Sequence, residues 1–234
     1  MTRTFGVSKL SVIDVRPSEA YRLGHVPYAV NVPNEVFRKH LQEPQAMAEV
    51  LGAAGVNPNE EAVIVSDSAL SPRSALAFLM LERLGQKKVS VLMGSVDEWG
   101  LSGLPLTKEA AADAKKTPPE PPARTTIYRA SLRPDLLVRD AGATKGAFPR
   151  VYVASGTGLP ARTPDGKVVH VPYTELLNAD GTPKAAKDIW NILVKAGVPR
   201  YAEIVCIADD PGQAAVNYFV FKLMGYPDVK VLAP

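Results

Sequence analysis

SVIDVRPSEAYRLGHVPYAVNVP, residues 11–33, is the stretch from which the fold can be inferred. Its apolar start at residues 12–13 predicts a buried strand. Ser18 then opens a helical stretch, which Gly24 ends. Residues 29–32 are apolar again and predict a second short strand. The stretch is therefore a strand–turn–helix–turn–strand unit.

The rest of the chain alternates between short apolar runs and stretches of helical periodicity. Further strands are predicted at residues 62–65, 88–92, 136–141, 204–207 and 229–232, and helices at residues 44–54, 73–84, 185–196 and 213–224. Such alternation predicts an α/β fold, in which a mainly parallel sheet is flanked by helices.

Composition excludes several classes of function. The 234 residues carry a formal charge of only +3, and the basic residues are scattered, so nucleic-acid binding is not predicted. No apolar run is long enough to span a membrane. The start of the chain shows no signal peptide, which predicts a cytoplasmic protein, or a periplasmic one if a signal has been removed. One cysteine and three separated histidines predict neither a disulfide nor a metal site, and no cofactor is expected.

The chain divides into two halves that repeat each other. Residues 107–126 are rich in Ala, Lys, Glu and Pro, which predicts a semi-rigid linker between domains at residues 1–106 and 127–234. VVHVPYTELL at residues 168–177 matches AVNVPNEVF in the first half. LLVRDA at residues 136–141 matches the strand that ends at Asp14.

Particular motifs give the repeat a family resemblance. The first strand ends in Asp14-x-Arg16 and is followed by a Gly-His-x-Pro turn that contains His25. A later stretch keeps glycine, valine, leucine, tryptophan and proline at set intervals, namely Gly85, Val89, Leu92, Gly94, Trp99, Gly103 and Pro105. The chain resembles the rhodanese sulfurtransferases, and the second half has segments similar to those of the tandem members, VPYTELLNADGT and GYPDVKV. The resemblance implies two tandem rhodanese-like domains, the second with a shortened C-terminal end.

The resemblance also implies a chemistry. A rhodanese uses a cysteine in the loop between a central strand and the next helix, where backbone N–H groups favour a thiolate that accepts sulfur as a persulfide. In the first domain this loop is SDSALSPRS, and Asp67 stands at the cysteine position with Arg73 as its expected ion partner. A carboxylate cannot carry sulfur, so the first domain is predicted to be non-catalytic.

In the second domain the equivalent loop is ADDPGQAA, from Ala208 through Asp209, Asp210, Gly212 and Gln213. The catalytic position falls at Ala208 or Asp209, and the single cysteine, Cys206, lies about two residues earlier. One interpretation makes Cys206 a buried residue of the strand. The other makes it the nucleophile of a lengthened loop, although the two aspartates would raise its pKa and repel an anionic donor. Asp140-Ala141-Gly142 also lacks the arginine of the family's Asp-Ala-Arg.

These features lead to two functional hypotheses. The first is a catalytically inactive rhodanese pair that acts as a binding, scaffold or regulatory module, with a protein partner in a sulfur or redox assembly. The alternative is an active sulfurtransferase that forms a persulfide on Cys206 from thiosulfate, mercaptopyruvate or a protein persulfide. Phosphatase-like chemistry is disfavoured because Gly212 stands where an arginine would be needed. His25 is expected to stabilise its turn, and Trp99 and Trp190 to anchor the core or the domain interface.

Overall fold

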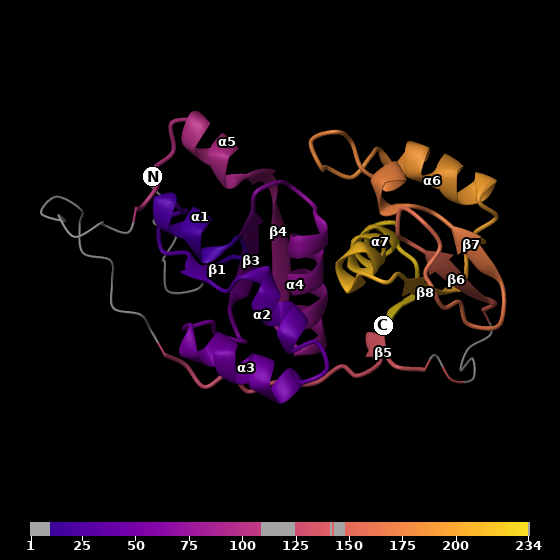
Figure 1. Ribbon diagram of the computed structural model, residues 1–234, viewed down its shortest axis with the longest axis horizontal. Helices are drawn as coiled ribbons and strands as arrows, with labels where there is room; N and C mark the ends of the chain where they lie inside the picture. The colour runs from indigo at the N-terminus through magenta and orange to yellow at the C-terminus, as the bar shows by residue number, and fades with distance from the viewer. Residues whose placement is uncertain (1–9, 109–124, 141, 143–147, 234) are drawn as a thin grey trace, which may run out of the picture.

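The computed structural model describes residues 10–108, 125–140, 142 and 148–233, and in these it contains two parallel β-sheets (Figure 1). The first has the strand order β2-β1-β3-β4 and the second β5-β9-β8-β6-β7. The strands are β1 (Leu10–Asp14), β2 (Val30–Asn31), β3 (Glu61–Ser66), β4 (Lys88–Ser95), β5 (Leu137–Val138), β6 (Arg150–Ala154), β7 (Val168–His170), β8 (Glu203–Ile207) and β9 (Asp228–Leu232). The helices are α1 (Ser18–Leu23), α2 (Asn34–Lys39), α3 (Pro44–Ala53), α4 (Pro72–Arg83), α5 (Val96–Leu101), the 3₁₀ helix η2 (Tyr173–Leu176), α6 (Ala186–Lys195) and α7 (Pro211–Leu223).

The first sheet has a packed layer on each face because its side chains alternate in direction along each strand. Ile13 and Ile64 belong to the large core that includes residues of α2, α3 and α4. Val63 and Val65 belong to a smaller cluster with Tyr21 of α1 and residues of α5. In the second sheet, Ile204 and Cys206 belong to the same large core as residues of α6, η2 and α7. The opposite face carries a cluster to which, among the described residues, only strands contribute.

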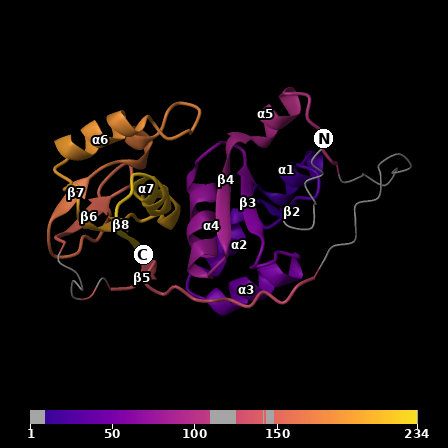
Figure 2. The ribbon, with the colours of Figure 1, turned by 180° about the vertical axis from the view of Figure 1, so that it is seen from behind.

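The two halves meet through α4 and α7, which lie side by side in both views (Figures 1 and 2). Phe78 of α4 packs edge-on against Phe219 of α7, with ring centroids 4.8 Å apart. Buried residues of both helices belong to one continuous hydrophobic core. The predicted packing of the two halves against each other is therefore present.

The segment that precedes the second sheet is attached to the first half. The N–H of Thr126 donates to the Gly52 carbonyl at 2.8 Å, and that of Ser131 to the Leu84 carbonyl at 2.9 Å. Gly85 ends α4 in a left-handed conformation, with φ of 78°, and a β-carbon there would lie 2.3 Å from the Ser131 carbonyl oxygen. Glycine is thus required at this contact. The linker predicted at residues 107–126 lies largely outside the described residues.

The sequence-based elements agree with the structure, with one correction. The predicted α/β fold, with parallel sheets flanked by helices, is confirmed, and α3, α4, α6 and α7 lie within two residues of their predicted bounds. The repeat alignment of residues 136–141 with the first strand is wrong. β6 pairs with β7 and β8 just as β1 pairs with β2 and β3, so β6 is the counterpart of β1. No helix of the described chain is both long and apolar enough to cross a membrane.

Candidate functional site

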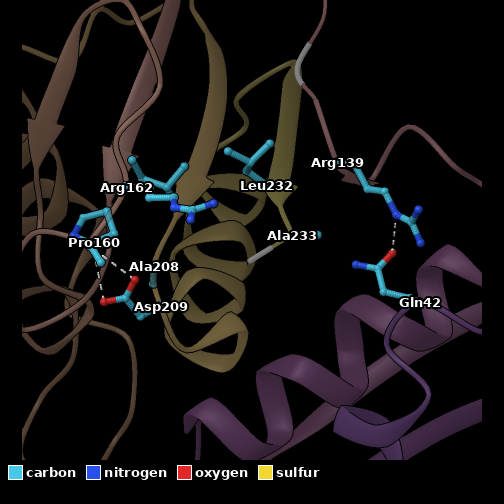
Figure 3. A pocket seen from close by; sticks show the side chains of 10 residues that line it. Gln42, Arg139, Pro160, Arg162, Ala208, Asp209, Leu232 and Ala233 are labelled. Carbon is cyan, nitrogen blue, oxygen red and sulfur yellow. Dashed lines mark hydrogen bonds between the residues drawn. The ribbon is translucent and has the colours of Figure 1, made fainter.

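A pocket of about 710 Å³ opens at the carboxyl end of the second sheet (Figure 3). The carboxyl edge of a parallel sheet is where ligands of open α/β folds bind. The last residues of β8 and β9, the residues that follow β5, β8 and β9, and the loop after β6 form most of the wall, and the first half supplies one residue. The lining residues are Gln42, Arg139, Pro160, Ala161, Arg162, Ile207, Ala208, Asp209, Leu232 and Ala233.

The predicted catalytic position lies in this pocket. The N–H of Val15 donates to the Val65 carbonyl in the first half, and the N–H of Ser155 donates to the Ile207 carbonyl in the second. Val15 directly follows β1 and Ser155 directly follows β6, so their carbonyl partners, Val65 and Ile207, occupy equivalent positions. Asp209, two residues after Ile207, is therefore the counterpart of Asp67. By this register, Gly156 replaces Arg16 in the second half, which corrects the assignment of Gly142 to that place.

Asp209 and Asp210 are both engaged by other groups. The Asp209 carboxylate accepts the N–H of Ala161 at 3.1 and 3.3 Å (Figure 3). Asp210 is the N-cap of α7 and accepts the N–H of Gly212 at 2.8 Å. It also forms a 2.8 Å ion pair with Arg38 of the first half. A protein carboxylate therefore lies at the helix N-terminus, where an anion would otherwise be favoured.

The start of α7 is closely packed. A β-carbon on Gly212 would lie 2.6 Å from the carbonyl oxygen of Pro72. Gln213 lies beside Gly156, so that a β-carbon on Gly156 would be 3.0 Å from the Gln213 side-chain oxygen. The first turn of α7 is thus covered by α4 and by the loop after β6.

Cys206 does not reach the pocket. It lies within β8, has 0% of its surface exposed, and packs in the large core that joins the two halves. It is not among the residues that line the pocket, although Ile207 and Ala208 are. Burial raises the pKa of the thiol far above its ordinary value, and a hydrogen bond with Ser155 lowers it only in part. Burial therefore favours the neutral thiol of Cys206 over the thiolate.

In the first half, the residue at the cysteine position forms an ion pair. Asp67 is paired with Arg73, as predicted, and accepts a 2.9 Å hydrogen bond from Ser66. Asp67 lines a second pocket of about 420 Å³ together with Arg16 and Lys108. The Arg16 guanidinium is 2.7 Å from both the Asp14 carboxylate and the Gly24 carbonyl oxygen. Arg16 thus holds the turn after β1 in place.

The remaining motif residues have structural contacts. His25 is fully buried, stacks on Tyr21 at 3.8 Å, and has Nδ1 3.0 Å from the Tyr21 carbonyl oxygen. The Trp99 indole donates to the Pro105 carbonyl at 2.9 Å. Gly94 precedes the capping box of α5 and would bring a β-carbon 3.3 Å from the Glu98 carboxylate. Trp190 of α6 lies under the Arg200 guanidinium at 5.0 Å.

The turn that contains His25 accommodates one departure from the Gly-His-x-Pro motif. Tyr28 stands where glycine is usual, and it is the non-glycine residue with positive φ, 66°, in the described backbone. A left-handed conformation favours glycine, so the turn retains the backbone shape although the residue has changed.

Two site residues were not identified from the sequence. Arg139 follows β5 and donates to the Gln42 side chain at 3.1 Å, across the boundary between the halves. Arg162 belongs to the loop after β6, and its side chain extends across the pocket toward Leu232 (Figure 3). The family motifs point to the loop after β8 and to Asp140-Ala141-Gly142 for the site of the second half, and neither contains a cation. Among the described residues, no cluster of three or more metal-binding side chains is present.

Comparisons with known proteins agree with this architecture. Residues 4–102 match the family model of the rhodanese-like domain. The "Putative thiosulfate sulfurtransferase" of Synechococcus elongatus is 27% identical over 256 residues, which cover 95% of this chain and 75% of the relative. The "Sulfur carrier protein TtuD" of Thermus thermophilus is 26% identical over 237 residues, covering 90% and 80%. The crystal structure of the 3-mercaptopyruvate sulfotransferase SseA from Escherichia coli superimposes with a TM-score of 0.79 at 23% identity, covering 96% of this chain and 91% of that one, and thus shows the fold.

Proposed function

We propose that this chain, which is related to the sulfurtransferases of the rhodanese family, transfers no sulfur itself and acts as a binding or regulatory module. Its partners would belong to a sulfur or redox assembly. A relative named as a sulfur carrier protein is consistent with that setting.

The burial of Cys206 is the observation that carries the proposal. Sulfur transfer through a persulfide needs a thiolate that a donor can reach. Cys206 has no exposed surface, and its pKa is raised by burial. To expose it, the helices that pack on this face of the second sheet, α7 among them, would have to move away from β8.

The charges near the pocket support the same conclusion. Asp209 lies at the carboxyl end of β8, and Asp210 caps α7 while bound to Arg38. An anionic donor would have to displace or approach these carboxylates. In the first half, Asp67 and Arg73 form an ion pair with each other. Neither loop therefore combines an anion-binding site with a nucleophilic side chain.

Persulfidation measured by intact mass spectrometry tests the proposal. The full chain is incubated with thiosulfate, and separately with 3-mercaptopyruvate, and compared with Cys206→Ala. We expect no gain of a sulfur atom in either protein. A gain in the wild type that is absent from Cys206→Ala would overturn the proposal and establish the alternative, an active sulfurtransferase that uses Cys206.

Alkylation supplies the matched control for accessibility. Cys206 should react slowly with iodoacetamide in the native protein and rapidly in guanidinium chloride, because unfolding exposes the thiol. Rapid reaction of the native protein would show that Cys206 is accessible and would contradict the structural basis of the proposal.

A further inference from the structure

We infer that the pocket at the carboxyl end of the second sheet binds an organic carboxylate with an apolar body, held without covalent chemistry. The inference rests on the proposed function, because it assigns a ligand to a site that has no reactive thiol. It concerns a ligand class larger and more apolar than a small inorganic sulfur donor.

The size of the pocket is the first argument. Its volume of about 710 Å³ lies within the range of roughly 300–1,000 Å³ that is typical of sites for small organic molecules. Thiosulfate, with five heavy atoms, would leave most of this space filled with water. The pocket therefore suits a molecule with a substantial body.

The second argument is the apolar character of one side. Ile207, Ala208, Leu232 and Ala233, from the ends of β8 and β9, are all apolar and line the pocket together. Ala208, which directly precedes the counterpart of the nucleophile position, Asp209, contributes a methyl group to this wall. A hydrocarbon segment could rest on this surface and be removed from water, which favours binding in proportion to the area buried.

The third argument is the excess of positive charge. Arg139 and Arg162 line the pocket with a single carboxylate, Asp209, which already accepts the Ala161 N–H. Within the described part of the chain, neither arginine forms an ion pair. In Figure 3 the two lie on opposite sides of the pocket, with Leu232 between them. Arg139 is anchored to Gln42, whereas the Arg162 side chain crosses the pocket and makes no hydrogen bond to a described residue.

These features assign distinct roles to the two ends of a ligand. A guanidinium presents paired N–H donors that match the two oxygens of a carboxylate, so Arg162 is the group expected to bind the charged end. The apolar body would lie over Ala208 and Leu232. The Arg139–Gln42 pair closes the opposite side and brings the first half into contact with the ligand.

Isothermal titration calorimetry of the full chain with butyrate, hexanoate and octanoate tests the inference. Affinity should rise along the series, by up to about fourfold for each methylene that is buried. Octanamide, which has the same body without the charge, should bind about tenfold or more weakly than octanoate. Thiosulfate should bind more weakly than octanoate, because it cannot use the apolar surface.

Two variants test the residues. Arg162→Gln should weaken octanoate binding about tenfold or more, whereas Arg22→Gln, an exposed arginine on α1, should leave it within about twofold. Leu232→Ser should flatten the dependence on chain length. Arg162 is exposed and makes no contact that folding needs, so its replacement should leave the melting temperature unchanged.

Three outcomes would overturn the inference. These are no saturable binding of octanoate, binding that is the same in Arg162→Gln, and thiosulfate binding as tight as that of octanoate. Failure here is distinct from failure of the proposed function, which would appear as persulfidation of Cys206 in the mass spectrum whether or not carboxylates bind.

Discussion

The Tyr218 hydroxyl on α7 donates a 2.6 Å hydrogen bond to the Glu82 carboxylate on α4, so a polar contact lies within the interface that joins the halves. Lys222 of α7 approaches the same carboxylate, with Nζ at 2.6 and 2.7 Å. Burial, followed by the negative charge of Glu82, raises the pKa of Tyr218, which therefore remains a hydrogen-bond donor at neutral pH. Glu82 thus connects two side chains of the other half to α4.

Tyr218→Phe should lower the free energy of unfolding by about 1.5–3 kcal/mol, because it removes a hydrogen bond to a charged group and leaves the ring in place. Chemical denaturation with an unchanged m-value would measure this loss. Tyr201→Phe is the matched control, since Tyr201 is 62% exposed and should tolerate the change. Equal stability of Tyr218→Phe and the wild type would show that the contact contributes nothing.

Gly212→Ala should destabilise the protein by about 1–3 kcal/mol, because its methyl group would lie 2.6 Å from the Pro72 carbonyl oxygen and force α7 away from α4. Thermal unfolding would report the change. Gly158→Ala provides the comparison, because a β-carbon at Gly158 meets no atom within 4 Å. If both variants melt at the wild-type temperature, the close approach of the helices is absent in solution.

Glu203 should make the second half sensitive to acid. Its burial acts to raise the pKa, but hydrogen bonds from Arg150 and Lys230 outweigh that effect and hold the pKa below its ordinary value of 4.5. Because the folded-state pKa is the lower one, this stabilisation is present above the unfolded-state value and is lost as the pH falls through the folded-state pKa.

Denaturant unfolding from pH 7 down to pH 3 would therefore show a smaller loss of stability in Glu203→Gln than in the wild type. At neutral pH the variant should be less stable, because Arg150 and Lys230 lose a charged partner. Glu19→Gln, at an exposed position, should follow the wild-type profile. Parallel profiles for Glu203→Gln and the wild type would refute this role.

Ala208→Cys, made in a Cys206→Ala background, should place the thiol at the pocket. Ala208 lines the pocket, whereas Cys206 does not, so the new thiol should react with iodoacetamide at least tenfold faster than Cys206 does in the wild type. Mass spectrometry of timed samples measures both rates. A rate as slow as that of Cys206 would show that β8 ends differently from the structure described.

The sequence predicted the helices and most strands because their signals are local. Ser18 and Gly24 bracket α1, and Gly85 adopts the left-handed conformation that ends α4. β6 was missed because a neighbouring apolar run happens to be followed by Asp140, which imitates the end of β1. Only the pairing of β6 with β7 and β8 corrects the repeat, and pairing is a property of the folded chain.

The candidate site was predicted only in part. Ala208 and Asp209 were found because a motif fixes their position relative to α7. Arg139 and Arg162 were not, because they are far from that loop in the sequence. They share its pocket only because the strand order places β5 and β6 on either side of β9 and β8.

The core shared by α4 and α7 has a consequence for synthesis of the protein. α4 ends at Arg83, and α7 begins at Pro211, well over a hundred residues later. At ~5–20 residues per second, a ribosome needs on the order of ten seconds to produce the intervening chain. Throughout that interval the apolar side of α4, including Phe78, lacks the helix that covers it in the finished protein. We expect the nascent chain to depend on chaperones during this delay, and the first half made alone to aggregate.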